Sequence, residues 1–460
     1  MKGRTFRERS AEALGDARLG AAIARTADLL RDKRAAAVRE HGDFEALRER
    51  GRAVKAKVAA DLEGYAAEFT KSATRAGAVV HRAADGAGVA AILKELAQKH
   101  GLKNAVKAKS MTAEEIDFES LAHAAGVEVT ETDLGEFIIQ LAGEKPSHIM
   151  APAIHRDRRQ VAELFHEKLS TDPGLGVEEL VAAARKYLRS RFLSADLGIT
   201  GVNFAAADTG TLVLVTNEGN GRMTTSLPRV HIALAGLEKI VPALADVPDL
   251  LGLLARSASG QAISSYLTFV TGPNRPGDEE GPRELHIILL DNGRSAMAAG
   301  EYSAMLHCLH CGACLNHCPV YRAVGGHAWA SPYPGPMGSV LSPLLWGLMA
   351  YPDLPDACTL CGRCREVCPM AIPLPDFHLR LRAENHSGER LPSLLAKVAA
   401  RGKLYSFIIA RFRSLLQRGL VPKAGKFAKG WSISRELPRP SDEPSFRKWW
   451  SRSNRGRKAP

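Results

Sequence analysis

All eight cysteines of the 460-residue chain lie in two short runs of matching spacing. The first run, CLHCGACLNHCPVY, covers residues 308–321, and the second, CTLCGRCREVCPMAIPLP, covers residues 358–375. Both have the form C-x2-C-x2-C-x3-C-P, which is typical of bacterial 4Fe–4S proteins. Three cysteines of such a run bind one cluster, and the fourth binds the neighbouring cluster. We therefore predict that the cofactors are two 4Fe–4S clusters.

The predicted ligand sets are reciprocal, because each takes three cysteines from one run and the last cysteine of the other. The ligands predicted for cluster 1 are Cys308, Cys311, Cys314 and Cys368. The ligands predicted for cluster 2 are Cys358, Cys361, Cys364 and Cys318. All eight cysteines are thus predicted to bind metal.

Disulfide bonds and zinc are the alternative uses for these thiols. Secreted disulfide scaffolds are small and distribute their cysteines through the fold, whereas this chain is long and 45% hydrophobic. Structural zinc sites use two C-x2-C pairs, or cysteine together with histidine. The repeated triplet followed by x3-C-P favours iron–sulfur clusters over both alternatives.

The residues around the cysteines support the same interpretation. Gly312 and Gly362 follow the second cysteine of each run, where the backbone must approach the cluster closely. His307, His310 and His317 lie beside the first run. Since four thiolates complete each site, we expect these histidines to support the site or lie at the surface.

The segment between the two runs is too long for a compact ferredoxin hairpin. It is rich in Gly and Pro and continues into the apolar stretch VLSPLLWGLMAY, which contains Trp346. This pattern predicts a helical two-cluster domain with Trp346 in its core. Because two clusters and no other redox motif are present, we expect the domain to relay electrons.

The rest of the chain divides into segments of different composition. Residues 1–70 show helical periodicity, with expected interruptions at Gly42 and Gly51. From about residue 75, predicted strands alternate with predicted helices, one of them at 114–126, which indicates an α/β domain with a largely parallel sheet. The predicted segments are a helical segment (1–70), the α/β domain (71–296), the helical dicluster domain (297–385) and a basic tail (386–460).

Two polar loops flank the predicted strand TLVLVTN and raise the question of a small-molecule site. The first loop is Asp208–Thr211, and the second runs from Asn217 to Arg222 and contains Glu218. Ligands of open α/β sheets bind at the carboxyl ends of strands. Neither loop is a nucleotide-binding motif, and a turn with a surface ion pair explains Glu218 and Arg222 equally well. His148 and His155 are expected to be structural.

The carboxyl-terminal 60 residues carry 16 Lys and Arg against 3 Asp and Glu, with aromatic residues between them. Such a segment is typical of binding to an anionic membrane or to an acidic partner. Nucleic acid is not an expected partner, because no recognition module accompanies the charge. The amino terminus lacks an apolar signal region and no segment has the length of a membrane span, so we expect a cytoplasmic protein, peripheral at the inner face of the membrane.

The chain resembles the lactate utilization protein B family along almost its whole length. The similar segments include KSMTAEEI, TDLGEFIIQL, PSHIMAPAIH, GITGVNFAAADTGTLVLVTNEGNGR, both cysteine runs and GWSISRELPRPSDEPSFRKWW. The resemblance implies a lactate-utilization domain with an isomerase/CoA-transferase-like parallel sheet, followed by a 4Fe–4S dicluster domain. It further implies L-lactate oxidation to pyruvate together with two companion subunits, a cysteine-rich protein and a second lactate-utilization-domain protein.

Three other functions compete with this one. The chain would be the electron-transfer subunit of another 2-hydroxy-acid or glycerol-3-phosphate dehydrogenase, or its α/β domain would bind substrate and catalyse the oxidation itself. An oxygen-sensing regulator that binds nucleic acid is the third alternative. Because the sequence has no flavin or nicotinamide fingerprint, we expect a non-catalytic electron-transfer component and assign no catalytic residue.

Overall fold

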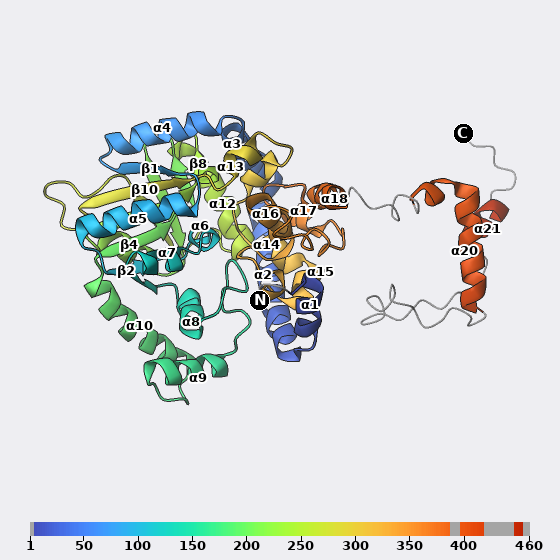
Figure 1. Ribbon diagram of the computed structural model, residues 1–460, viewed down its shortest axis with the longest axis horizontal. Coiled ribbons are helices and arrows are strands. Elements are labelled where there is room, and N and C mark those ends of the chain that lie inside the picture. The colour runs from blue at the N-terminus through green and yellow to red at the C-terminus, as the bar shows by residue number, and fades with distance from the viewer. Residues whose placement is uncertain (1–3, 387–395, 418–445, 454–460) are drawn as a thin grey trace. The chain divides into compact units, whose positions relative to one another are not determined.

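The computed structural model describes residues 4–386, 396–417 and 446–453. The chain divides into two compact units, Met1–Asn385 and His386–Pro460. The first unit contains both sheets and both cysteine runs, and its elements are shown in Figure 1. No helix in the described ranges is long and apolar enough to cross a membrane.

The centre of the first unit is a six-stranded sheet in the order β1-β10-β7-β4-β2-β3, and all its neighbouring strands are parallel. The strands are β1 (Val79–Ala83), β10 (Glu284–Leu290), β7 (Val230–Gly236), β4 (Leu197–Gly201), β2 (Asn104–Lys107) and β3 (Glu128–Glu131). Every residue of β7 is buried, as expected for a central strand covered on both faces. The prediction of an α/β domain with a parallel sheet is confirmed.

A second, four-stranded sheet has the order β8-β5-β6-β9. Its strands are β8 (Ile240–Val241), β5 (Phe204–Ala206), β6 (Thr211–Thr216) and β9 (Tyr266–Val270). β5 pairs with β6 and β6 with β9 in antiparallel fashion, whereas β5 and β8 are parallel. The predicted strand TLVLVTN therefore belongs to this sheet and not to the parallel one.

Helices connect the strands of the α/β region. They are α5 (Gly86–His100), α6 (Met111–Glu115), α7 (Phe118–Ala124), α8 (Leu134–Ala142), α9 (Arg158–Leu169), α10 (Val177–Ser194), α11 (Asn220–Ser226), α12 (Val247–Ala258) and α13 (Arg294–Ala298), with short 3-10 turns at Leu237–Lys239 and Leu244–Asp246. The single helix predicted for residues 114–126 is wrong in detail. Asp117 has a left-handed φ of 50° and separates α6 from α7, and its carboxylate accepts hydrogen bonds from Ser120 and Lys145.

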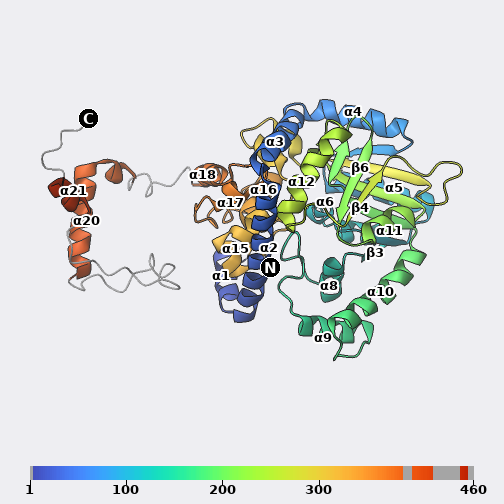
Figure 2. The same ribbon diagram turned by 180° about the vertical axis from the view of Figure 1, so that it is seen from behind.

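The amino-terminal helices pack on both the α/β region and the cysteine-rich region. They are α1 (Phe6–Leu14), α2 (Ala17–His41), α3 (Phe44–Ala60) and α4 (Leu62–Arg75). α2 contacts α14 and α15, and α12 lies beside both α2 and α3 (Figure 2). Gly42 ends α2 as predicted, but Gly51 lies inside α3 and interrupts nothing. A Cβ at Gly51 would lie 2.4 Å from Leu253 Cδ1, so glycine allows α3 to approach α12.

The cysteine-rich region is helical, as predicted. Its helices are α14 (Ala313–His317), α15 (Pro319–Val324), α16 (Gly335–Trp346), α17 (Arg363–Val367) and α18 (Leu374–Asn385), with 3-10 turns at Ser303–His307 and His327–Trp329. One buried core joins it to the amino-terminal helices and the second sheet, since Ile23, Leu212 and Trp329 belong to the same apolar cluster. Trp346 is partly buried against this core.

The second unit has two described helices with assigned bounds, α20 (Gly402–Gln417) and α21 (Phe446–Ser453). Apolar side chains on both are exposed, among them Phe407, Phe412 and Trp449. Much of the predicted basic tail lies outside the described residues.

A buried ion-pair network joins the α/β region to the cysteine-rich region. Arg294 is 3% exposed and donates two hydrogen bonds to Glu115, at 2.6 and 3.0 Å, and one to Glu238. Tyr333, from the cysteine-rich region, donates its hydroxyl to Glu115. Burial opposes ionisation of Glu238, but Arg294 and Lys239 hold the pKa of its carboxyl well below the ordinary value.

Replacing Arg294 with Met should lower the free energy of unfolding of the full chain by about 3–5 kcal/mol, because the buried Glu115 would lose its counterion and Glu238 would keep only Lys239. Urea unfolding followed by circular dichroism measures this loss. Arg50→Met, which breaks an exposed pair with Asp249, is the matched control and should cost less than about 1 kcal/mol. Equal effects of the two substitutions would contradict the structural role of the network.

Candidate functional site

The two cysteine runs adopt the same backbone conformation. His310 and Leu360 have left-handed φ angles of 55° and 56°, and Gly312 and Gly362 follow at 75° and 82°. In each run the glycine precedes a one-turn helix, α14 or α17, and an extended cysteine and a proline come after it. The repeated spacing in the sequence is therefore a repeated structure, in which α14 packs against α17.

This backbone directs amide groups toward the sulfur atoms. The N–H of His310 donates to Cys308 Sγ at 3.4 Å, and the N–H of Leu360 donates to Cys358 Sγ at 3.3 Å. The N–H of Tyr321 donates to Cys318 Sγ at 3.5 Å. Such bonds stabilise thiolates bound to a cluster and tune its reduction potential.

The structure brings the last cysteine of the second run to the first run. Cys308, Cys311, Cys314 and Cys368 line one cavity together with Pro369 and apolar side chains. Burial raises the pKa of Cys308 and of Cys311 to about 12, and the nearby Cys368 contributes to both shifts. A buried cavity with four converging thiols offers the donor set that a 4Fe–4S cluster requires.

The last cysteine of the first run lies with the second run in the same way. Burial raises the pKa of Cys364 to about 12, and Cys358, Cys318 and Cys361 add to the shift. Burial likewise raises the pKa of Cys318 to about 11, with contributions from Cys358 and Cys361. The two groups are neighbours, because Cys364 also raises the pKa of Cys314. Cys361 is exposed, whereas in the first group Cys311 and Cys368 are buried and Cys308 and Cys314 are half-buried.

Basic side chains from the amino-terminal helices hold the second run in place. Arg34 of α2 donates to the carbonyl of Val367 at 2.7 Å, and Arg48 of α3 donates to the carbonyl of Cys368 at 2.7 Å. In addition, Arg382 of α18 donates to the carbonyl of Cys358 at 2.6 Å. These arginines also place positive charge near thiolates, which favours the anionic form of a thiolate-bound cluster.

Sequence reasoning did not identify these cations. Arg34 and Arg48 lie more than 300 positions before the carbonyls that they contact. Lys55 is 3% exposed, donates to the carbonyl of Glu238 and lies near Cys308. Burial lowers the pKa of Lys55 to about 8, an effect that Glu238 partly offsets. In the sequence, these residues belong to an ordinary mixed-charge helical segment, so no local pattern distinguishes them.

The side chains of His310 and His317, beside the first run, contact groups other than the cysteine thiols. His310 Nδ1 lies 2.8 Å from Lys239 Nζ, and the His310 ring packs against that of Tyr333. His317 Nδ1 donates to the carbonyl of Ala313 at 2.9 Å. Burial lowers the pKa of His307 to about 4.

His148 connects the α/β region to the first cysteine run. Its Nδ1 accepts hydrogen bonds from the N–H groups of Met150 and Ala151, at 3.0 and 3.1 Å. Its Nε2 therefore carries the proton and donates to Asn316 Oδ1 at 3.2 Å. His155 pairs with Glu144 at 2.7 Å.

The two polar loops around β6 have different surroundings. Asn217, Glu218 and Asn220 line a cavity in the α/β region. Arg222 pairs with Glu280 at the surface, 3.4 Å away, so it does not act with Glu218. In the first loop, Asp208 accepts a hydrogen bond from the N–H of Leu244.

The buried position of His148 gives a pH prediction. Burial, assisted by Lys109, lowers the pKa of His148 to about 3. In the unfolded chain His148 takes up a proton near pH 6.5, whereas in the folded chain it stays neutral at that pH. The contribution of His148 to the free energy of unfolding is therefore constant above pH 6.5, and it falls below that pH by at most about 1.4 kcal/mol per pH unit. His148→Gln should therefore show a shallower loss of stability between pH 6.5 and 5 in urea unfolding. Identical pH profiles for the two proteins would refute this role.

Comparison with known protein families agrees with this geometry. Residues 66–290 match the LUD domain, and residues 304–372 match the 4Fe-4S dicluster domain. The dicluster match confirms the prediction of two 4Fe–4S clusters over zinc, and none of the eight cysteines, all of them within the described ranges, forms a disulfide.

The chain is also similar to full-length curated proteins. It is 38% identical to lactate utilization protein B of Bacillus licheniformis, over 97% of this chain and 96% of that protein. It is 39% identical to lactate utilization protein B of Bacillus pumilus, over 98% and 97% of the two chains. It is 38% identical to the uncharacterized electron transport protein YkgF of Escherichia coli, over 97% and 96%. The chain therefore belongs to the lactate utilization protein B family.

Proposed function

We propose that this chain relays the electrons released when L-lactate is oxidised to pyruvate, within a system of several subunits. The observation that carries the proposal is the convergence of eight cysteines into two adjacent groups, of which the second includes the exposed Cys361. The similarity to lactate utilization protein B over nearly the whole chain supports lactate as the substrate of the system.

We assign Cys308, Cys311, Cys314 and Cys368 to cluster 1, and Cys358, Cys361, Cys364 and Cys318 to cluster 2. Each bound cluster exchanges single electrons at a potential set by hydrogen bonds, charge and solvent access. The chain supplies those influences through N–H groups directed at sulfur and through Arg34, Arg48 and Lys55. Cys361 gives the second group access to a partner at the surface.

The oxidation of lactate itself would take place with the companion subunits, a cysteine-rich protein and a second LUD-domain protein. In this arrangement the chain is an electron-transfer component of an L-lactate dehydrogenase complex. Arg34, Arg48 and Arg382 then serve to hold the second cysteine run and to influence the cluster potentials.

Paired substitutions test the crossed ligand sets. Cys314→Ala with Cys368→Ala removes two ligands of the same cluster, so the protein should keep about half of its iron. Cys364→Ala with Cys368→Ala removes one ligand from each cluster, so most of the iron should be lost. Iron and sulfide analysis of anaerobically purified proteins measures both. The reverse order of iron contents would show that each run binds its own cluster.

A reconstituted system tests the relay. Lactate-dependent reduction of a one-electron dye by the two companion subunits should increase at least about tenfold when this chain is added, because the clusters provide the path to the acceptor. The Cys364→Ala, Cys368→Ala protein should give no increase. A full rate without this chain, or an undiminished rate with that variant, would refute the relay.

We further propose that the basic residues 401–460 bind the anionic inner face of a membrane. α20 exposes Phe407, Ile408 and Phe412 beside Arg411, a combination typical of interfacial helices. Removing residues 401–460 should abolish co-sedimentation with vesicles containing phosphatidylglycerol. Unchanged co-sedimentation would contradict the proposal, and vesicles of phosphatidylcholine alone are the control.

A further inference from the structure

The α/β region contains a cavity of about 190 Å³ at the carboxyl ends of four neighbouring strands. Its lining includes residues that follow each strand: Lys239 after β7, Asn203 after β4, Lys109 and Ser110 after β2, and Asp133 after β3. The volume is below the roughly 300–1,000 Å³ of sites for drug-sized ligands, so the cavity suits a small molecule.

The cavity lies where the order of strands in the parallel sheet reverses. From β2 the chain proceeds to β3 on one side, whereas β4, β7 and β10 follow one another on the other side. The reversal therefore falls between β2 and β4, and residues after both strands line the cavity. Ligands of open α/β sheets bind at this kind of position.

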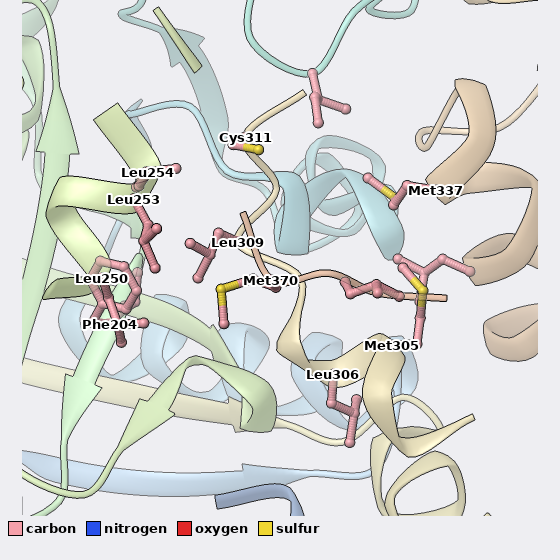
Figure 3. Close-up of a cluster of buried hydrophobic side chains, with 14 of the residues drawn as sticks. Phe204, Leu250, Leu253, Leu254, Met305, Leu306, Leu309, Cys311, Met337 and Met370 are labelled. Atoms are coloured by element: carbon pink, nitrogen blue, oxygen red, sulfur yellow. The ribbon is translucent and has the colours of Figure 1, made fainter. Parts of the chain in front are cut away.

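The same cavity adjoins the first cysteine group. Ile149, Leu309 and His310 line both this cavity and the one that contains Cys308, Cys311, Cys314 and Cys368. Figure 3 shows Leu309 between Leu253 and Leu254 of α12 on one side and Met370 on the other. A ligand in the cavity would thus be separated from cluster 1 by a single layer of side chains.

Asn220, in the lining of the cavity, has a side-chain oxygen that accepts no hydrogen bond from the described residues. Thr132 donates its hydroxyl to the carbonyl of Lys107 at 2.8 Å, so its oxygen must accept from the Asn220 amide, 3.4 Å away. That contact fixes the NH2 group of Asn220 toward Thr132. Asn220 is 5% exposed, and among the groups that the structure describes its Oδ1 has no hydrogen-bond partner. Buried polar atoms normally have partners, so a donor from a ligand is expected here.

The lining also provides cationic donors. Lys109 forms an ion pair with the buried Glu136, whose Oε1 lies 3.2 Å from Lys109 Nζ, and among the described residues this Nζ donates no hydrogen bond. Lys239 lines the cavity as well, and it is paired with Glu238 at 3.3 Å. Asp133 and Glu218 also line the cavity and oppose this charge, and burial, with a contribution from Asp133, raises the pKa of Glu218. A ligand with a carboxylate near Lys109 and a hydroxyl that donates to Asn220 Oδ1 would add a second anion to the Lys109–Glu136 pair and would give Asn220 Oδ1 a partner.

We propose that this cavity binds a small 2-hydroxy carboxylate, with its carboxylate at Lys109 and its hydroxyl at Asn220, one side-chain layer from cluster 1. The inference rests on the proposed function for its choice of substrate class. It extends that function, because the chain would bind the reductant of the system as well as relay its electrons.

Anaerobic titration calorimetry of the cluster-loaded full chain tests the site, with L-lactate and propionate as probes. Propionate lacks the hydroxyl, so it should bind about tenfold more weakly than L-lactate. Asn220→Ala should remove this discrimination, and Lys109→Met should abolish detectable binding of both acids. Arg222→Gln, outside the cavity, is the control and should behave as the wild type. Circular dichroism and iron content establish that each variant is folded.

The affinities of the wild-type chain for the two acids are measured without any variant. They therefore test the proposed site even if a substitution prevents folding. No saturable heat with L-lactate, or equal affinities for the two acids, would overturn the site. If lactate then still reduced the clusters in the presence of the companion subunits, the relay would stand without the site. Selective binding of L-lactate without any reduction of the clusters would support the site and refute the relay.

Discussion

Four thiols gathered in one buried cavity are the constraint on which the rest of this structure depends. Burial, together with the neighbouring thiols, raises the pKa of these thiols, so the polypeptide by itself disfavours the thiolate form that binds iron. Metal, amide N–H groups and nearby cations must compensate. The amide groups come from the left-handed turns at His310 and Leu360, and cations come from α2 and α3. The cysteine runs therefore require elements that lie hundreds of residues earlier in the chain.

This requirement explains why residues 1–385 form one compact unit. The amino-terminal helices hold the second cysteine run, and the core that they share includes Trp329. On the α/β side, Arg294 and His148 join the parallel sheet to Tyr333 and Asn316 of the cysteine-rich region. A cavity at the carboxyl ends of the parallel strands then lies against the first cysteine group. The proposed ligand cavity and the proposed site of cluster 1 therefore share lining residues.

Much of this could be predicted from sequence, because cysteine spacing and strand–helix alternation are local patterns. The repeat of C-x2-C-x2-C-x3-C-P predicted the clusters, and the alternation predicted the parallel sheet. Contacts between distant segments were not predictable. From sequence, Gly51 indicates a helix break, whereas in the fold it allows α3 to pack closely on α12. Arg48 likewise resembles any other surface charge on a helix, although it donates to the carbonyl of Cys368. The sequence indicates a polar loop after β6, but only the fold shows that Asn220 lines the cavity whereas Arg222 lies at the surface.

Low-temperature EPR of the anaerobic protein, mixed with its two companion subunits and frozen after L-lactate is added, tests the central claim most directly. The account predicts signals of reduced 4Fe–4S clusters that appear with lactate in the mixture, and that are absent when the Cys364→Ala, Cys368→Ala variant replaces this chain. Clusters that dithionite reduces but lactate never reduces, even with both companions present, would contradict the claim. The chain would then carry electrons from a different donor.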